Sequence, residues 1–369
     1  METSLTIQCG IVALTKLKQQ FLNDEYEKLQ YFLQTGEDLG LHSANKQQAR
    51  RFYKVVKKGK EYPLSIRNDL LKIKRVGNKV SEYWAKIPVK ATRKLWVAIK
   101  LHRSFPEKYK VCESKLYRRD NRFYLNVAIK FEVSITTSFH KLLAVDLGER
   151  TIASTVLLCN GKISHPRFYG KTARGIRRHY AWLRKRLGEK KALKTIKKVG
   201  HTERRKVNAI LHKISKAIVE EAKRENAIIV IGNLHGIRDR ARGKGKRFNR
   251  IVSNMPFHRL SMMIEYKAIQ QGILVVSTSE AYTSQTCHVC GCDGNRKTQG
   301  LFVCPYHGEY NADLNGAINI GKKFERDLGY MPLSGVACEP TLNSECYISE
   351  KPSLPCRMVV HILKSMVIV

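Results

Sequence analysis

Two short pairs of metal-binding residue types lie close together in the C-terminal third of this chain of 369 residues. Cys287 and Cys290 form a Cys-x-x-Cys pair, and Cys304 and His307 form a Cys-x-x-His pair after an interval of thirteen residues. Paired soft ligands at this spacing are typical of tetrahedral Zn²⁺ sites. Because four protein ligands leave no open position for water, we predict a structural zinc ribbon over residues 283–310.

The remaining cysteines define the alternatives to this zinc site. Cys292 lies beside the first pair and could replace one of the four ligands. A set of buried free cysteines is the other interpretation, and the paired spacing with Gly291 and Gly308 alongside makes it the weaker one. The other six cysteines are far apart, unlike a disulfide framework. A ribbon this small has little core, so bound metal would contribute most of its folding free energy.

The charge balance indicates the kind of partner. Lysine and arginine outnumber the acidic residues by 68 to 31, which gives a formal net charge of +37. A hydrophobic share of 43% is too high for a disordered polycation, so the length predicts two or three globular domains. Charge repulsion of this size favours a polyanionic partner, either nucleic acid or an anionic membrane surface.

No segment of the sequence has the pattern of a membrane span or a leader. No apolar run reaches the ~18–20 residues that cross a bilayer, and the start of the chain lacks a charged region followed by a long apolar one. We therefore expect a soluble, cytoplasmic, nucleoid-associated protein without a membrane partner, and the sequence leaves its oligomeric state unknown.

Residues 1–140 combine helical and strand patterns. Apolar residues recur at helical spacing between positions 14 and 33, and the basic stretch 45–60 continues as helix or loop. From residue 115 the period changes to two, and alternate residues from Phe123 to Ile129 are apolar after a polar turn at 118–121. These patterns predict a small barrel or sheet with a helical insert.

Residues 141–330 have the pattern of an α/β domain. Apolar strands are expected at 142–148, 152–158, 227–232 and 273–277, with helical stripes at 176–187, 207–218 and 256–270. A pair of adjacent strands followed by alternating helices and strands predicts a mixed sheet. The tail, 331–369, holds three acidic and three basic residues, so we expect a peripheral extension without the basic excess.

Two aspartates lie where a cation could be held. Asp146 ends an apolar strand just before Gly148, and Asp313 lies at the start of a helix behind the zinc-binding pairs. Carboxylates at such points suit a hard cation. Taken alone, Asp146 is equally a turn-forming residue, and Asp313 is equally an acid favoured by the helix dipole.

The motifs together resemble a known family. VDLG at 145–148, YTSQTCHVCG at 282–291 and NADLNGAINI at 311–320 are similar to the TnpB/OrfB proteins of insertion-sequence transposons, which are relatives of type V CRISPR effector nucleases. The resemblance covers about residues 140–325. It implies a RuvC-like domain of RNase-H fold with an inserted zinc ribbon, preceded by a wedge barrel with a helical recognition insert. It also implies a guide RNA and cleavage of guide-matched double-stranded DNA, with one strand displaced.

The resemblance also assigns site residues. Asp146 matches the first RuvC acid and Asp313 the third, while Cys287, Cys290 and Cys304 match zinc ligands and His307 takes the place of the usual fourth cysteine. The second acid is a departure, because the strand that should end in Glu ends here in Gly232 and Asn233.

Another carboxylate must replace the missing acid if the domain is active. Glu265 is the first candidate, because its helical neighbours are largely apolar and because some family members supply a Glu from the following helix. A simple pair with Lys267 is the alternative, and Glu280 is the reserve candidate. With three acids present, the mechanism is two-metal phosphodiester hydrolysis, in which Asp146 bridges two Mg²⁺ ions and Glu265 and Asp313 each hold one.

Basic and aromatic residues indicate nucleic-acid contacts elsewhere. Residues 171–206 contain fifteen Lys and Arg against two Glu, which predicts a phosphate-tracking surface, with the loop 238–250 as a second contact. Tyr53, Trp84, Trp96 and Tyr117 are candidates for stacking on RNA bases. We therefore predict a transposon-encoded, RNA-guided DNA endonuclease. A nuclease-inactive, guide-directed DNA-binding regulator is the rival interpretation, and a zinc-ribbon DNA-binding protein without a guide is the third.

Overall fold

The computed structural model describes residues 1–136, 139–159, 161–233, 245, 256–298 and 300–327. The chain forms two compact units, Met1–Glu132 and Val133–Val369, so the division by contacts lies slightly before the boundary predicted at residue 140. The predicted basic loop, apart from Gly245, and the whole predicted tail lie outside the described residues. The two units are described separately below.

The first unit is built on an antiparallel sheet. Its order is β2-β7-β8-β1-β5-β4-β3, with β6 paired to β8. The predicted hairpin is confirmed: the turn residues Asp120 and Asn121 have positive φ, and the alternate apolar side chains of β8 are buried. Within residues 1–132 the strand pairings do not join β2 to β3, so closure into a barrel stays a prediction. The strands are β1 (Glu2–Val12), β2 (Leu64–Ile66), β3 (Lys72–Arg75), β4 (Tyr83–Val89), β5 (Thr92–Leu101), β6 (Lys110–Val111), β7 (Ser114–Arg119) and β8 (Arg122–Glu132).

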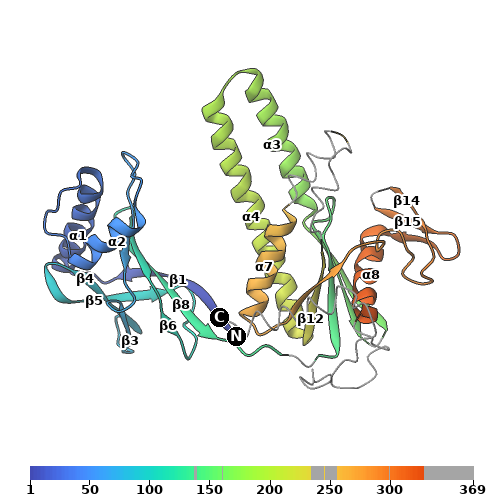
Figure 1. Cartoon of the computed structure of the whole chain (residues 1–369), viewed down its shortest axis with the longest axis horizontal. Coiled ribbons are helices and arrows are strands. Elements are labelled where there is room, and N and C mark those ends of the chain that lie inside the picture. Colours follow the sequence, from blue (N-terminus) through green and yellow to red (C-terminus); the bar gives the residue numbers. More distant parts are fainter. Residues whose placement is uncertain (137–138, 160, 234–244, 246–255, 299, 328–369) are drawn as a thin grey trace, which may run out of the picture. The chain divides into compact units, whose positions relative to one another are not determined.

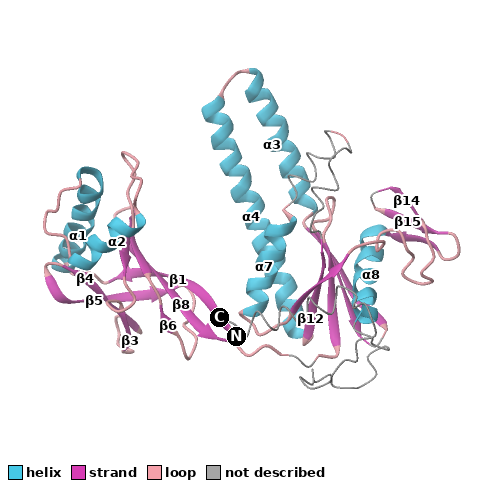
Figure 2. Cartoon of the chain, in the orientation of Figure 1, coloured by secondary structure: helices cyan, strands magenta, loops and turns pink. Residues whose placement is uncertain are grey.

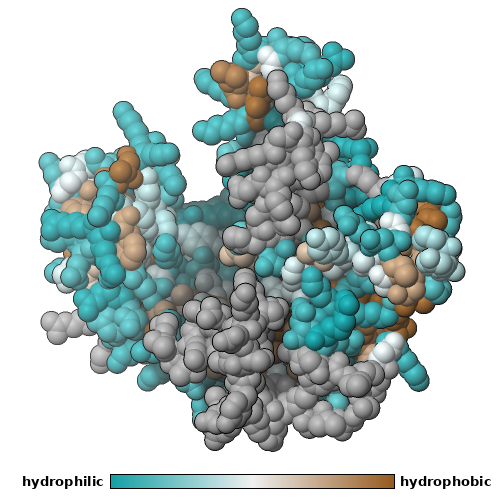
Figure 3. Space-filling model, turned by 45° about the vertical axis from the view of Figure 1, so that its right-hand side comes forward, coloured by the Kyte–Doolittle hydropathy of each residue, from teal (hydrophilic) through white to brown (hydrophobic). Residues whose placement is uncertain are grey.

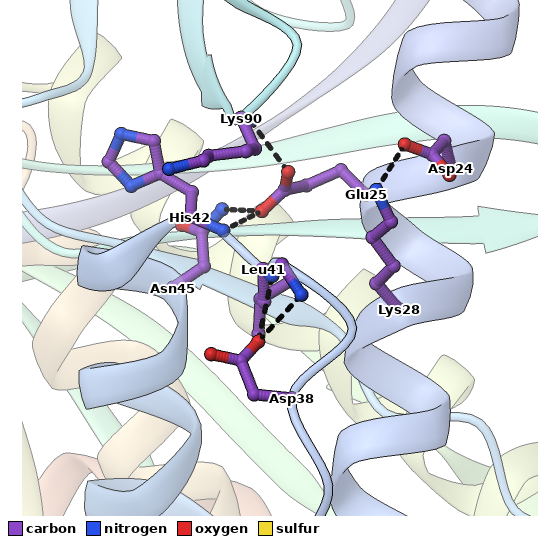
Figure 4. A network of polar contacts seen from close by, with 9 residues as sticks. Asp24, Glu25, Lys28, Asp38, Leu41, His42, Asn45 and Lys90 are labelled. Atoms are coloured by element: carbon purple, nitrogen blue, oxygen red, sulfur yellow. Dashed lines mark hydrogen bonds and ion pairs between the residues drawn. The ribbon is translucent and has the colours of Figure 1, made fainter.

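Two helices pack on this sheet, α1 (Lys16–Thr35) and α2 (Ser43–Phe52). The apolar spacing predicted the first, and the stretch 45–60, predicted as helix or loop, is helical only as far as Phe52. Glu25 on α1 is 2% exposed, and its carboxylate accepts hydrogen bonds from the amide of Asn45 and from the backbone N–H groups of His42 and Lys90 (Figure 4). A buried carboxylate is costly unless it is paired in this way. Glu25 therefore ties α1, α2 and the β4–β5 turn together and has a structural role.

The second unit contains a five-stranded mixed sheet of order β11-β10-β9-β12-β13. β9 and β10 are antiparallel, as are β10 and β11, whereas β12 runs parallel to both β9 and β13. This confirms the predicted mixed α/β sheet, although the last strand begins at Val275, two residues later than predicted. The strands are β9 (Lys141–Asp146), β10 (Ala153–Cys159), β11 (Lys162–Tyr169), β12 (Ala227–Asn233) and β13 (Val275–Ser279).

Helices cover both faces of this sheet (Figures 1 and 2). The long helices α3 (Lys171–Glu189) and α4 (Leu193–Arg224) and the shorter α7 (Phe257–Ile269) share a core with Leu143 and Val145 of β9. Helix α8 (Ala312–Asp327) shares the opposite core with Leu142 and Ala144. Since successive side chains of a strand point to opposite faces, the alternation along β9 produces this three-layer arrangement.

A small three-stranded sheet lies between β13 and α8 in the sequence. It is formed by β14 (Asn295–Thr298), β15 (Leu301–Cys304) and β16 (Gly308–Asn311). Its core consists of little more than Phe302, Ala312 and the two buried cysteines 287 and 304. In the part of the chain that the structure describes, no helix combines the length and apolar character that crossing a membrane requires.

Candidate metal centres

An acidic cavity of about 560 Å³ lies at the end of the mixed sheet of the second unit. Its walls come from the ends of β9 and β13, from β14 and from the first turns of α8. Four acidic residues line it, Asp146, Glu149, Glu280 and Asp313, together with three cationic ones, Arg150, Arg296 and Lys297. A cavity lined by both carboxylates and cations can hold metal ions as well as a phosphate group.

The period of the strands directs two of these acids to the same face. Leu142 and Ala144 point toward α8, and Asp146 follows at the next alternate position of β9. Val276 of β13 also points toward α8, and Glu280 continues its alternation just beyond the strand. Both carboxyl groups therefore reach the side of the sheet that α8 covers.

Asp313 comes to the same place because a new helix begins there. The side-chain oxygen of Asn311 accepts hydrogen bonds from the backbone N–H groups of Asp313 and Leu314, at 3.0 Å each, which caps the N-terminus of α8. Gly316, one turn later, leaves room for the neighbouring acid: a Cβ there would lie 3.1 Å from Oδ2 of Asp146. The predicted meeting of Asp146 and Asp313 is thus found in the cavity.

Gly232, the residue that replaces the expected second acid, lies directly under another carboxylate. A Cβ built on Gly232 would come within 2.6 Å of the carboxyl carbon of Glu280, well inside any real contact. Only a glycine at the end of β12 accommodates the Glu280 side chain in its present position. The structure therefore places a carboxyl group over the strand end at 232, supplied from β13 instead of β12.

The structure does not bring Glu265 to this cavity. Its helix, α7, packs through Leu260, Met263 and Ile264 into the core on the other face of the sheet, together with α4. Glu265 is only partly buried, and its neighbour Met262 is 51% exposed, so the apolar setting expected from the sequence is not present. The five-stranded sheet separates the helix that carries Glu265 from the helix that carries Asp313.

The surroundings of Asp146 in the cavity raise the pKa of its carboxyl group. Burial and the neighbouring Asp313 carboxylate raise the pKa of Asp146 to about 7, while the charge of Arg296 lowers it. Arg296 belongs to β14, and its guanidinium lies 3.1 Å from Oδ1 of Asp313. A cation stabilises the neighbouring carboxylates of Asp146 and Asp313, and a divalent metal ion would neutralise more of their charge than one guanidinium does.

The raised pKa of Asp146 predicts a pH-dependent stability without divalent cations. Its carboxyl binds a proton more readily in the folded chain, so the stability it contributes is present below about pH 4 and lost as the pH rises through about 7. In EDTA, Asp146→Asn should therefore melt several degrees above the wild type at pH 8 and close to it at pH 4. Calorimetry at both pH values, with and without Mg²⁺, checks this; a difference that does not change with pH would contradict it.

The second metal-binding group is the predicted zinc set. One potential ligand atom from each of Cys287, Cys290, Cys304 and His307 lies within 4.8 Å of all the others. Sγ of Cys304 lies 3.6 Å from Sγ of Cys290 and 3.8 Å from Nδ1 of His307. Zinc–sulfur bonds of about 2.3 Å in a tetrahedron place two sulfurs about 3.8 Å apart, so the residues fit a Zn²⁺ ion.

Local hydrogen bonds lower the pKa of one of these ligands, Cys304. Although burial raises the pKa of Cys304, the backbone N–H of Tyr306 and the ring of His307 lower it to about 6, which favours the thiolate that binds metal. Cys292 is exposed, and its carbonyl accepts from the backbone N–H of Cys287 at 2.9 Å. Within the described residues, the side chain of Cys292 is not part of the four-ligand group.

Two asparagines of α8 join the zinc-binding segment to the core of the second unit. The amide of Asn319 donates to the carbonyls of Thr283 and Thr286 at 2.9 and 2.7 Å, and that of Asn315 donates to Thr286 at 2.8 Å. Thr283 in turn donates its hydroxyl to the carbonyl of Glu280 at 2.9 Å. The same helix therefore carries Asp313 and fixes the chain between Glu280 and the first zinc ligands.

The basic helices α3 and α4 form a long hairpin with few acids of its own. Glu189 and Glu203 both pair within the hairpin, with Arg186 and Arg184, which leaves a large cationic excess. The described surface in Figure 3 is coloured mainly as hydrophilic. The predicted phosphate-tracking role stays a prediction.

The aromatic candidates of the first unit are all partly buried. Tyr53 donates to the carbonyl of Pro63, and Tyr117 stacks on Tyr124. Lys18 lies over Trp84 and Lys74 over Trp96. These contacts account for the four rings within the unit, and base stacking by them stays a prediction.

Residues 257–320 match the family model described as Cas12f1-like, TNB domain. The chain is 31% identical over 217 residues to the CRISPR-associated endodeoxyribonuclease Cas12f2 of a Micrarchaeota archaeon, covering 54% of this chain and 40% of that protein. It is 29% identical over 200 residues to a TnpB-like protein of Methanocaldococcus jannaschii, covering 52% of this chain and 72% of that protein.

Among solved structures, the cryo-EM structure of the Cas12f1-sgRNA-target DNA complex aligns with a TM-score of 0.40 and 14% identity, over 86% of this chain and 98% of that chain. The match to Cas12f2 spans less than half of that relative's length.

Proposed function

We propose, on the premise that this chain is related to the TnpB-like and Cas12f proteins as its motifs predicted, that it is an RNA-guided DNA endonuclease with a RuvC-like domain of RNase-H fold. The observation that carries the proposal is the meeting of Asp146, Glu280 and Asp313 in one cavity. The mixed sheet, with its antiparallel first strands and parallel last ones, agrees with that fold.

Three carboxylates from three separate elements would hold two Mg²⁺ ions. Asp146 is central, since it lies against Gly316 of the helix that carries Asp313, and Glu280 completes the set over Gly232. Oxygen donors of this kind suit Mg²⁺, which when bound activates water and stabilises the leaving oxygen of a phosphodiester. We assign the second acid to Glu280 in place of Glu265.

The chain's cations orient the substrate. Arg150 and Lys297 line the same cavity as the acids, and Arg296 already contacts Asp313 there. Guanidinium groups bind phosphate oxygens through paired hydrogen bonds, so these side chains can hold the DNA backbone against the carboxylates. None of the three is singled out by the sequence, because in a chain with 68 basic residues no spacing distinguishes them.

The guide RNA and the DNA partners come from the resemblance, supported by the charge. The basic α3–α4 hairpin offers a surface for phosphate backbones, and a guided nuclease leaves sequence choice to base pairing. The zinc-binding group would support the ribbon that supplies Arg296.

The rival interpretation, a regulator without nuclease activity, was favoured by Gly232 in the place of an acid. The carboxyl group of Glu280 beside Gly232 supports the nuclease instead.

Cleavage by the purified full chain tests the proposal. Protein carrying its copurified RNA should cut DNA that matches this RNA in Mg²⁺ and remain inactive in EDTA. Asp146→Asn should lower the rate by at least about 10³-fold, since a bridging carboxylate is worth several kcal/mol in the transition state. Specific binding without cleavage by the wild type would favour the regulator, and the absence of a discrete bound RNA would favour the zinc-ribbon protein without a guide.

A further inference from the structure

An exposed aromatic residue lies within the segment after β13 that contributes to the wall of the acidic cavity. Tyr282 lies between Glu280 and Thr283, which both line the cavity, and its own side chain is 72% exposed. Its φ is +67°, a left-handed conformation that bulky residues seldom adopt. Neither core packing nor a backbone requirement for this residue type explains a tyrosine at this position.

The surroundings hold this backbone firmly in its unfavourable conformation. The carbonyl of Tyr282 accepts hydrogen bonds from the backbone N–H groups of Gln285 and Thr286, at 3.0 and 3.2 Å, and from the Thr286 hydroxyl at 3.1 Å. Asn319 fixes the carbonyls of Thr283 and Thr286 from below. Strain that neighbouring contacts enforce is found most often where a side chain must be presented to a ligand.

We propose that the ring of Tyr282 stacks on an unpaired base of the DNA strand that enters the cavity, and so positions the nucleotide next to the phosphate that is cut. This inference rests on the proposed nuclease function and adds to it a residue that contacts the DNA strand. A cationic groove with an aromatic platform is how proteins hold single strands without reading sequence. Here Arg150 and Lys297 line the cavity beside the acids and would supply the cations, and Tyr282, two residues after Glu280 in the sequence, would supply the platform.

Photocrosslinking tests this contact directly. The full chain, with its copurified RNA retained, is mixed with a single-stranded oligodeoxynucleotide containing 5-iodouracil, with Ca²⁺ in place of Mg²⁺, and irradiated. Mass spectrometry of the digested protein should find a crosslink on the peptide that contains Tyr282. Tyr282→Phe should retain the crosslink, whereas Tyr282→Asn, which tolerates the left-handed backbone but lacks the ring, should lose it.

Kinetics and stability give a second readout. In Mg²⁺, Tyr282→Asn should raise the KM for DNA about 10-fold with little change in kcat, as expected for a lost base stack, and its melting temperature should not fall. Tyr266→Ala, which removes another partly exposed tyrosine from α7, is the matched control and should change neither value.

The two proposals fail in different ways. Crosslinks confined to other peptides, or equal crosslinking by Tyr282→Asn, would overturn the stacking role even if the protein cuts DNA. A crosslink at Tyr282 in a wild-type protein that does not cut would support the stacking contact, and would overturn the proposed nuclease and with it the positioning of a phosphate for cleavage.

Discussion

Replacing Glu280 with Gln is expected to lower the rate of Mg²⁺-dependent DNA cleavage by at least about 10³-fold, because the neutral amide cannot supply the charge of a metal ligand. Glu265→Gln should leave the rate within about twofold, because a surface substitution outside the site has small effects. Single-turnover cleavage by the two purified variants, carrying the same RNA as the wild type, measures this directly.

A double substitution at positions 232 and 280 tests more strictly whether Glu280 is the second acid. Gly232→Glu alone should disturb the site, since its side chain would overlap that of Glu280. When Gly232→Glu is combined with Glu280→Gly, the carboxylate is supplied by β12 itself, and the double variant should recover part of the lost cleavage rate. Full activity in Glu280→Gln, or a large loss in Glu265→Gln, would contradict the cavity as the metal site.

The position of Glu265, away from the cavity, shows what the sequence alone could predict. Its helical neighbours Met262 and Ala268 suggested a buried carboxylate, but helical spacing does not tell which face of a sheet the helix will cover. The signal that favours Glu280 was present in the strand: Val276 and Glu280 lie an even number of residues apart, so they share a face, provided the extended conformation continues beyond Ser279. Recognising it required knowing that this face is the one that α8 covers.

Other parts of the site were predictable because they depend on local patterns. The four zinc-binding residues depend on spacing within short segments. Asp146 and Asp313 lie at a strand end and a helix start, local features that became a site prediction only through the family resemblance. The first strand, β1, was not predicted, and it pairs with the distant β8 and β5. Partners so far apart in sequence leave no signal in a local periodicity, and the same holds for the cations that line the cavity.

Removing one zinc ligand should have the largest effect on folding of any substitution discussed. Cys304→Ser is expected to abolish the binding of one Zn²⁺ per chain, because metal binding supplies about 10–16 kcal/mol in small zinc modules and the ribbon core here is minimal. Hydrogen exchange should then show residues 286–311 unprotected, while β9, β10 and β12 remain protected. Zinc content by plasma mass spectrometry and exchange by mass spectrometry check the two statements.

The zinc variant should also lose cleavage, although no zinc ligand touches the acidic cavity. Asn311 caps the helix that carries Asp313, Arg296 comes from β14, and Asn319 holds the segment after Glu280, so an unfolded ribbon removes supports for two of the three acids. A fall in the cleavage rate of at least about 10²-fold is expected, comparable to displacing a catalytic group by about 1 Å.

Cys292→Ser is the control and should keep both zinc and activity, whereas Asp146→Asn should keep zinc but not activity. If Cys304→Ser lost zinc and still cut DNA at the wild-type rate, the two metal centres would be independent, and the asparagine contacts along α8 would have no part in holding the acids together.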